Sequence, residues 1–264
     1  MNPADEHSPF SLAGRRAALT GAMGRVGRGI ARALALAGAE TVLLDVDLSA
    51  ADEVVAGLVD PAAVHCRRLD LTDLERLEQN ISELERELGP IDIWINSAYP
   101  RTNRWGLPLE RETPADWRAN LDMQLNSYCL SSRAVARRMA RRGSGSIVNL
   151  ASIYGLVAPD FGVYQGTDKS MPGAYAAVKG GIVAYSRWLA SYFGPRGVRV
   201  NVVCPGAVAS GQQEPFLSQY NRRTLLGRMA GAEEIGHPVV FLASDAASYI
   251  TGAVLPIDGG LTAV

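Results

Sequence analysis

Three side chains in the second half of the sequence are suited to acid–base chemistry on an alcohol or a ketone. Tyr175 and Lys179 stand four residues apart in a segment of helical periodicity, so they share one face of the predicted helix. A free tyrosine, with a pKa of about 10, is a poor proton donor at neutral pH, and a neighbouring ammonium lowers that pKa. Ser152 follows a predicted strand and offers a hydroxyl that can hold a substrate oxygen. On spacing alone, a solvated Tyr–Lys pair is the more frequent explanation.

A glycine-rich turn near the N-terminus has the composition of a dinucleotide phosphate site. The segment TGAMGRVG at residues 20–27 follows a predicted strand and opens a helix. Glycines let the backbone approach a pyrophosphate, and the first turn of the helix offers unpaired N–H groups at the positive end of its dipole. A glycine-rich turn alone would be weak, but the strand–turn–helix context supports phosphate binding.

Carboxylates follow the next two predicted strands. Asp45 lies 18 residues after Gly27, where it can accept both hydroxyls of an adenosine ribose and repels a 2′-phosphate. No Lys or Arg follows in the next several residues, so the sequence favours NAD over NADP. Asp70 ends a third predicted strand, where its carboxylate can meet an adenine amino group. It fits equally the entry to a helix capped by Thr72 and Glu75.

These residues need a scaffold, and short apolar runs that alternate with helical periods predict one. Alternation of this kind implies a parallel sheet with helices on both faces. We predict a single domain over residues 13–264, a doubly wound (Rossmann) mostly parallel α/β sheet of about seven strands, after a poorly ordered tail at 1–12. The predicted strands are 17–19, 42–44, 64–69, 91–95, 147–150, 198–203 and 254–257, and the longer helices are 74–88, 114–142, 174–193 and 233–243.

Composition excludes several classes of function. The 264 residues carry a net charge of −1. The chain therefore lacks the excess of basic residues expected of a protein that binds nucleic acid or anionic membranes. No apolar run is long enough to span a bilayer, and no secretory signal is visible. Three scattered cysteines and three distant histidines fit neither a disulfide framework nor a metal site. We therefore expect a cytoplasmic protein without a metal.

The motifs occur in an order that resembles the short-chain dehydrogenase/reductase family over residues 12–262. That resemblance implies hydride transfer between a secondary alcohol and a ketone, with NAD as cofactor, a small-molecule substrate and a homotetrameric assembly. The matching pieces are TGAMGRVG at 20–27, Asp45, DLT at 70–72, NSA at 96–98, IVNLAS at 147–152, YAAVK at 175–179, RVNVVCPG at 199–206 and FLASDAASYITGAVLPIDGG at 241–260.

The resemblance also implies a role for each residue. Tyr175 exchanges a proton with the substrate oxygen, Lys179 lowers the pKa of Tyr175 and binds the nicotinamide ribose, and Ser152 positions the carbonyl. The helix asparagine that often completes this catalytic set aligns with Gln124. The cofactor would be held by Gly21, Met23, Arg25, Val26, Gly27, Asp45, Asp70, Leu71, Asn96, Ala98, Tyr175, Lys179, Pro205, Gly206 and Val208.

Four departures from the family pattern bear on the cofactor and the substrate. Arg25 stands where a glycine is usual and is able to reach a phosphate, Tyr99 replaces the last glycine after the fourth strand, and Gln124 replaces asparagine. Residues 159–173 form an insertion between Ser152 and Tyr175, which we predict to act as a lid on the substrate side.

The segments 99–105 and 159–173 are polar with aromatic residues interleaved. Solvated loops are one reading, and a pocket for a polyhydroxylated or anionic substrate is the other. Both segments look similar to a bacterial subgroup linked to surface-sugar biosynthesis. The candidate substrate contacts are Tyr99, Arg101, Arg104 and Tyr164.

Three functions are compatible with these observations. The first is a dehydrogenase of a sugar-like or nucleotide-sugar alcohol. The second is a 3-oxoacyl-thioester reductase on acyl carrier protein, although such reductases usually prefer NADP, against which Asp45 counts. The third is a non-catalytic dinucleotide-sensing module. It is favoured slightly by the departures from the family pattern at Arg25, Tyr99 and Gln124. It is opposed by the intact catalytic set of Ser152, Tyr175 and Lys179.

Overall fold

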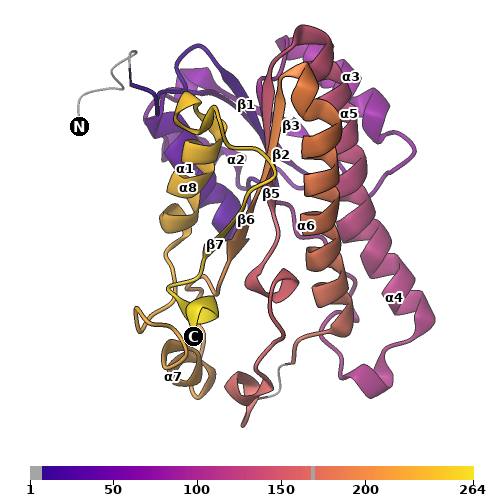
Figure 1. Ribbon diagram of the computed structural model, residues 1–264, viewed down its shortest axis with the longest axis vertical. Helices are drawn as coiled ribbons and strands as arrows, with labels where there is room; N and C mark the ends of the chain where they lie inside the picture. The colour runs from indigo at the N-terminus through magenta and orange to yellow at the C-terminus, as the bar shows by residue number, and fades with distance from the viewer. Residues whose placement is uncertain (1–7, 168–169) are drawn as a thin grey trace.

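The computed structural model describes residues 8–167 and 170–264, and within them seven strands form one parallel sheet (Figure 1). The strand order is β3-β2-β1-β4-β5-β6-β7, so the chain reverses its direction of progress between β1 and β4. This arrangement confirms the predicted doubly wound sheet. The strands are β1 (Arg16–Thr20), β2 (Glu40–Asp45), β3 (Val64–Arg68), β4 (Ile93–Asn96), β5 (Gly145–Leu150), β6 (Val198–Pro205) and β7 (Val254–Ile257).

Helices cover both faces of the sheet (Figure 1). One apolar core joins the sheet to α1 and α8, and a second joins it to α3, α5 and α6. Gly29 on α1 and Gly236 on α8 let these two helices touch backbone to backbone, because a Cβ on Gly236 would lie 2.7 Å from the Gly29 carbonyl oxygen. The helices are α1 (Arg25–Leu36), α2 (Ala51–Ala56), α3 (Leu77–Leu88), α4 (Pro114–Asn120), α5 (Ser127–Arg142), α6 (Gly173–Phe193), α7 (Phe216–Asn221) and α8 (Ala232–Ala243).

Two predicted helices differ from the observed ones. Helix α3 begins at Leu77 instead of residue 74, because Asp70 accepts hydrogen bonds from the Thr72 backbone N–H (2.9 Å) and hydroxyl (2.7 Å) and draws Thr72 into a turn. The single helix predicted for 114–142 consists of α4, a π-helical turn at Leu121–Asn126, and α5. Its predicted start is confirmed, since Thr113 and Asp116 form a capping box.

The tail predicted for residues 1–12 is wrong for its last five residues. Leu12 is fully buried in the core beside α1, and its backbone N–H donates to the Ala37 carbonyl at 2.8 Å. Phe10 packs on Phe241 of α8 with ring centres 6.2 Å apart. Residues 8–12 therefore belong to the folded body, and residues 1–7 lie outside the described part of the chain.

Candidate active site

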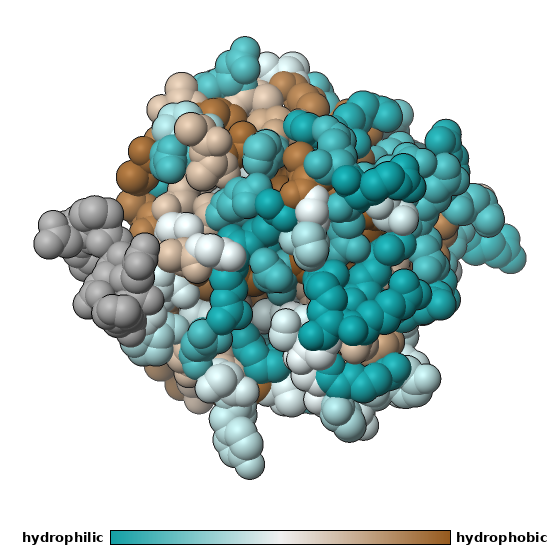
Figure 2. All heavy atoms as spheres, turned by 90° about the horizontal axis from the view of Figure 1, so that it is seen from above, coloured by the Kyte–Doolittle hydropathy of each residue, from teal (hydrophilic) through white to brown (hydrophobic). Residues whose placement is uncertain are grey.

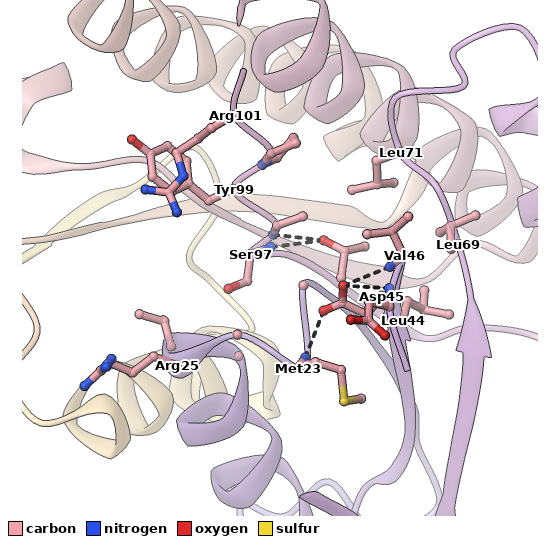
Figure 3. A pocket seen from close by; sticks show the side chains of 18 of the residues that line it. Met23, Arg25, Leu44, Asp45, Val46, Leu69, Leu71, Ser97, Tyr99 and Arg101 are labelled. Atoms are coloured by element: carbon pink, nitrogen blue, oxygen red, sulfur yellow. Dashed lines mark hydrogen bonds between the residues drawn. The ribbon is translucent and has the colours of Figure 1, made fainter. Parts of the chain in front are cut away.

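A cavity of about 1030 Å³ lies beyond the carboxyl ends of β1, β2, β3 and β4 (Figure 3). Its volume is at the upper end of the roughly 300–1,000 Å³ typical of ligand pockets. It occupies the position where doubly wound sheets bind dinucleotides, at the reversal of strand order. Among the predicted cofactor residues, the lining includes Gly21, Met23, Arg25, Val26, Gly27, Asp45, Asp70, Leu71, Ala98 and Val208.

The glycine-rich turn is shaped for a close backbone approach. Gly21 has φ of 69°, and a Cβ there would lie 2.5 Å from the Ala98 Cα, so a side chain is excluded on both grounds. Gly24 is the N-cap of α1 and has no side chain to cap the first-turn N–H groups. Those N–H groups, at the cavity wall, suit a pyrophosphate.

Asp45 marks the far end of the cavity from Tyr99 (Figure 3). Its Oδ2 accepts from the Met23 backbone N–H at 2.9 Å and its Oδ1 from the Val46 N–H at 2.8 Å. These bonds fix the carboxylate and leave it further lone pairs, because an ionised carboxylate accepts about four hydrogen bonds. The turn and the carboxylate therefore fit a pyrophosphate followed by a ribose diol, as a nicotinamide dinucleotide requires.

Several predicted cofactor residues have other partners. Arg25 projects away from Asp45 (Figure 3), and its guanidinium donates to the Ala209 carbonyl oxygen at 2.9 Å. The Asn96 side chain is fully buried outside the cavity, where its amide donates to Asn149 at 2.8 Å. Pro205 and Gly206 also lie outside the cavity lining, and Gly206 faces Tyr220, whose hydroxyl would be 2.7 Å from an added Cβ. For these last three positions cofactor binding stays a prediction.

The predicted catalytic residues converge. Ser152 follows β5, Tyr175 and Lys179 lie in the first two turns of α6, and the Ser152 side chain lies near enough to Tyr175 to lower its pKa. Lys179 is buried, and its Nζ donates to the Leu150 carbonyl oxygen at 3.1 Å. Its Nζ also lies 5.6 Å from the centre of the Tyr175 ring. The sequence therefore predicted the three-residue cluster correctly.

Burial dominates the acid–base properties of this cluster. It lowers the pKa of Lys179 to about 8, because an ammonium loses its hydration there. It also raises the pKa of Tyr175, and the Ser152 side chain opposes that rise. Burial is therefore the largest influence on the pKa of Tyr175, and the lowering of that pKa by Lys179 stays a prediction. The Lys179 ammonium faces the Tyr175 ring and the Leu150 carbonyl.

Gln124 lies within the π-helical turn and is only 2% exposed. Within the described residues, neither its amide oxygen nor its amide nitrogen has a hydrogen-bond partner. A buried amide without partners costs free energy, so such groups are retained mainly where function uses them. Met123, the preceding residue, lines the cavity. The arrangement is compatible with the predicted site role of Gln124.

The predicted substrate residues divide into two groups. Tyr99 and Arg101 line the cavity. Arg104 does not: its Nε donates to the Asp116 carboxylate at 2.8 Å and its NH2 group to the Arg111 carbonyl at 3.1 Å, which corrects the expectation that it binds substrate. Tyr164 packs on Phe216 of α7 with ring centres 5.4 Å apart.

The predicted lid segment is only partly described, since residues 168–169 lie outside the described residues. Within it, Asp160 pairs with Arg223 at 2.7 Å. Phe161–Tyr164 forms a short 3-10 turn. A lid function for residues 159–173 stays a prediction.

Sequence reasoning missed aromatic residues that surround the catalytic tyrosine. Trp105 lies 6.0 Å from Tyr175 between ring centres, and Tyr128 places its ring 5.4 Å from the Lys179 Nζ. Tyr154, two residues after Ser152, is buried. The available signal was position: Trp105 and Tyr154 both follow the carboxyl end of a predicted strand, where ligands of such sheets bind.

Known proteins share this architecture and these motifs. Residues 21–262 match the family model described as enoyl-(acyl carrier protein) reductase. The chain is 37% identical to galactitol 2-dehydrogenase (L-tagatose-forming) of Cereibacter sphaeroides, over 98% of this chain and 99% of the relative. It is 33% identical to gluconate 5-dehydrogenase of Gluconobacter oxydans, over 96% of each. It is 31% identical to 3-oxoacyl-(acyl-carrier-protein) reductase of Escherichia coli, over 96% of this chain and 99% of the relative.

Solved structures agree with these relatives. Gluconate 5-dehydrogenase from Burkholderia cenocepacia, in complex with NADP and tartrate, superposes with a TM-score of 0.86 at 29% identity, over 97% of this chain and 98% of that one. A short-chain dehydrogenase from Leptospira borgpetersenii with bound NAD+ gives 0.84 at 28% identity, over 96% and 95%.

The chain belongs to the short-chain dehydrogenase/reductase family. It is an NAD(P)-dependent oxidoreductase that acts on CH–OH groups, and the predicted family and reaction class are confirmed. None of the relatives named here is described by surface-sugar biosynthesis, so that finer resemblance stays a prediction. Among the described residues, no helix is long and apolar enough to cross a membrane.

Proposed function

We propose that the protein interconverts a polyhydroxylated, sugar-like secondary alcohol and the corresponding ketone, with NAD as its preferred cofactor. The observation that carries the proposal is the convergence of Ser152, Tyr175 and the buried Lys179, whose Nζ lies 5.6 Å from the Tyr175 ring centre, next to a cavity that ends in Asp45. Relatives named for galactitol, gluconate and D-threitol, at 33–37% identity, support the substrate class.

The chemistry divides among the three side chains. Ser152 donates a hydrogen bond to the substrate oxygen and orients it toward Tyr175. In the oxidative direction Tyr175 accepts the hydroxyl proton while the carbinol C–H bond breaks, and in the reductive direction it returns that proton. Bound NAD+ or NADH supplies the hydride acceptor or donor. Lys179, with a pKa of about 8, is mostly protonated at neutral pH, and its charge favours the phenolate form of Tyr175 when the site is occupied.

Cofactor preference rests on Asp45. A carboxylate at the end of β2 suits a ribose diol and repels a 2′-phosphate. Arg25, the residue that would reverse the preference, is directed to the Ala209 carbonyl and away from Asp45. Relatives in this family hold either cofactor, as the NADP-bound and NAD+-bound structures illustrate. Steady-state kinetics with both cofactors test the preference, and a higher kcat/KM with NADP would refute it.

A second candidate is reduction of a 3-oxoacyl thioester on acyl carrier protein. It is supported by the family model and by 31% identity to the Escherichia coli reductase. The deciding assay is a pair of panels: NADH formation from polyols, aldonates and nucleotide sugars, and NADPH or NADH consumption with 3-oxoacyl thioesters. Turnover of thioesters alone would refute the sugar-like substrate.

We also propose that the protein is a homotetramer. Trp188 and Tyr192 on α6 are 54% and 56% exposed, and their rings stack with centres 5.1 Å apart. An exposed apolar stack of this kind on a long helix is suited to an isologous contact with a second copy. Light scattering is expected to give four times the 28.2 kDa of one chain, and a mass of one chain would refute the assembly.

A further inference from the structure

Three aromatic rings meet at the catalytic tyrosine. The ring centres of Tyr99 and Tyr175 are 5.8 Å apart, those of Tyr99 and Trp105 5.9 Å, and those of Trp105 and Tyr175 6.0 Å. The interplanar angles are 84°, 75° and 66°, so each pair is arranged edge to face. This geometry and spacing are favourable for aromatic pairs. The three rings therefore form one triangular cluster that includes the proton donor.

Tyr99 occupies the place between the cofactor cavity and the catalytic residues. It lines the cavity, whereas the described lining does not include Ser152, Tyr175 or Lys179. Its ring centre lies 5.6 Å from the Lys179 Nζ. Tyr99 keeps 40% of its surface exposed, so it is not a core residue that packing alone explains. Tyr99 therefore contacts both the cavity and the Tyr175 ring.

Two neighbours fix the orientation of the Tyr99 ring. It packs edge to face on the Trp105 ring, with ring centres 5.9 Å apart. The Arg101 guanidinium lies 5.0 Å from the ring centre, within the range of a cation–π contact. Both contacts are made with the ring of Tyr99, and they hold it at the boundary of the cavity.

Further aromatic side chains lie in the segment between Ser152 and Tyr175. Tyr154 follows Ser152 by two residues and is buried, and Tyr164 packs on Phe216 with ring centres 5.4 Å apart. These residues add aromatic surface to the segment that leads from Ser152 to Tyr175.

We propose that Tyr99, held by Trp105, is a specificity-determining residue that stacks on the C–H face of a polyhydroxylated substrate while Ser152 and Tyr175 engage its reacting oxygen. The inference rests on the proposed function and names what selects the substrate. A sugar-like chain or ring presents C–H bonds on one face and hydroxyls at its edges, which matches an aromatic face bordered by polar groups. A small diol, with little C–H surface, gains much less from the same ring.

The test compares a polyol with a small diol in wild-type protein and in variants of Tyr99. The polyol is the best substrate of the panel above, and the diol is meso-2,3-butanediol, the substrate named for a relative with 34% identity. An aromatic contact is worth about 0.5–1.5 kcal/mol, so Tyr99→Ala is expected to lower the polyol-to-butanediol ratio of kcat/KM by up to about tenfold. The loss should appear in KM for the polyol, and Tyr99→Phe, which restores a ring, should recover most of the ratio.

Two controls separate this role from a structural one. Tyr249→Ala removes a fully exposed tyrosine outside the cavity lining, and it should keep the wild-type ratio. NAD affinity is measured separately for each variant by quenching of protein fluorescence, and thermal melting confirms that each variant folds.

Each possible outcome decides the question. An equal loss of kcat/KM for polyol and diol in Tyr99→Ala would mean that the ring only positions Tyr175. Weakened NAD binding in that variant would mean that Tyr99 contacts the cofactor. Either result overturns the proposal. An unchanged ratio overturns it as well. Failure of the proposed function is distinguishable, because wild-type protein would then oxidise no polyol, and the stacking proposal would fall with it.

Discussion

The edge of the sheet where the strands begin and the edge where they end contain the same kinds of residue but arrange them in opposite ways. At the edge where the strands begin, charges are paired: Arg16 meets Glu40 at 2.8 Å, and Arg142 meets Glu85 at 3.1 Å. This face of the molecule is largely hydrophilic (Figure 2). At the edge where the strands end, Lys179 is buried against a backbone carbonyl and aromatic rings, and the Gln124 amide is buried without partners among the described residues. Paired groups stabilise, and groups left without partners are available for a ligand.

The cavity repeats this contrast on a smaller scale. Its ribose end is preorganised, since two backbone N–H groups fix Asp45 before any ligand arrives. The catalytic residues beyond Tyr99, at the opposite end, are costly to the folded protein, because burial opposes the charge on Lys179 and the ionised form of Tyr175. The following predictions test this difference between the edges, beginning with the largest expected effect.

Replacing Tyr175 with Phe should have the largest effect. The variant keeps the ring in the three-ring cluster and removes the hydroxyl that exchanges the proton with the substrate. Loss of a general acid–base typically costs 10²–10⁴-fold, so kcat should fall by that factor. NAD affinity, measured by fluorescence, and the melting temperature should stay near the wild-type values. Substantial activity in this variant would refute the mechanism.

Replacing Lys179 with Met should abolish most activity and stabilise the protein. Burial lowers the folded-state pKa of Lys179 to about 8, below its ordinary value of about 10.4. Between these two values the unfolded chain binds more protons, so the free energy of unfolding contributed by Lys179 rises with pH there and is least below about pH 8. Methionine removes that penalty, and a gain on the order of 1–3 kcal/mol at pH 7 is expected, reduced by the lost ring contacts.

Urea denaturation at pH 7 and at pH 10 measures that difference. The stabilisation by Lys179→Met should shrink as pH rises, because neutral lysine carries no penalty. Arg16→Met at the opposite edge is the matched control, and it should not stabilise, because Arg16 is paired with Glu40. A Lys179→Met variant that is less stable than wild type at pH 7 would show that the ring contacts outweigh the burial cost.

Replacing Asp45 with Ser should weaken discrimination between the cofactors. The change removes the carboxylate that repels a 2′-phosphate and keeps a small polar side chain at the end of β2. We expect the ratio of kcat/KM for NAD to that for NADP to fall about tenfold or more, since one lost charge-assisted contact is worth about 1.5–3 kcal/mol. Asp47→Ser, two residues on, is the control with the same change of charge. A similar fall in both variants would indicate a general electrostatic effect in place of a contact by Asp45.

Much of this site could be predicted from the sequence because its determinants are local. The spacing of Tyr175 and Lys179 follows from helical periodicity, and the turn at residues 20–27 follows from glycines between a strand and a helix. The parallel sheet with helices on both faces follows from the alternation of strands and helices. These features need no knowledge of distant contacts.

The remaining features of the site could not be predicted, because they depend on hydrogen-bond partners further along the chain or on a helix type that the apolar pattern does not distinguish. The sequence alone does not show that the Arg104 guanidinium donates to the Asp116 carboxylate at 2.8 Å. Nor does it show that the Asn96 amide donates to Asn149 in the buried interior. The π-helical turn around Gln124 has nearly the same apolar pattern as an α-helix, so the sequence predicted one continuous helix there.

The smallest expected effect concerns Glu40, at the edge away from the site. Its hydrogen bond with Arg16 lowers its pKa, so the stabilisation is present above the ordinary glutamate pKa of about 4.3 and is lost as pH falls through the lowered value. Glu40 is 34% exposed, and a pair of this kind contributes about 0–1 kcal/mol after solvent screening. Glu40→Gln should therefore lower the melting temperature at pH 7 by no more than a few degrees.

Kinetics complete the comparison of the two edges. Glu40→Gln should keep wild-type kcat/KM, because the pair lies at the start of β2 and Asp45 lies five residues further along, at the end of the same strand. The stability difference from wild type should vanish in melts carried out below the lowered pKa of Glu40, where both proteins carry a neutral side chain. A large loss of kcat/KM at pH 7, with the fold intact, would contradict the division of the sheet into a stabilising edge and a functional edge. It would mean that the charge pair at the start of β2 helps to set the position of Asp45 at its end.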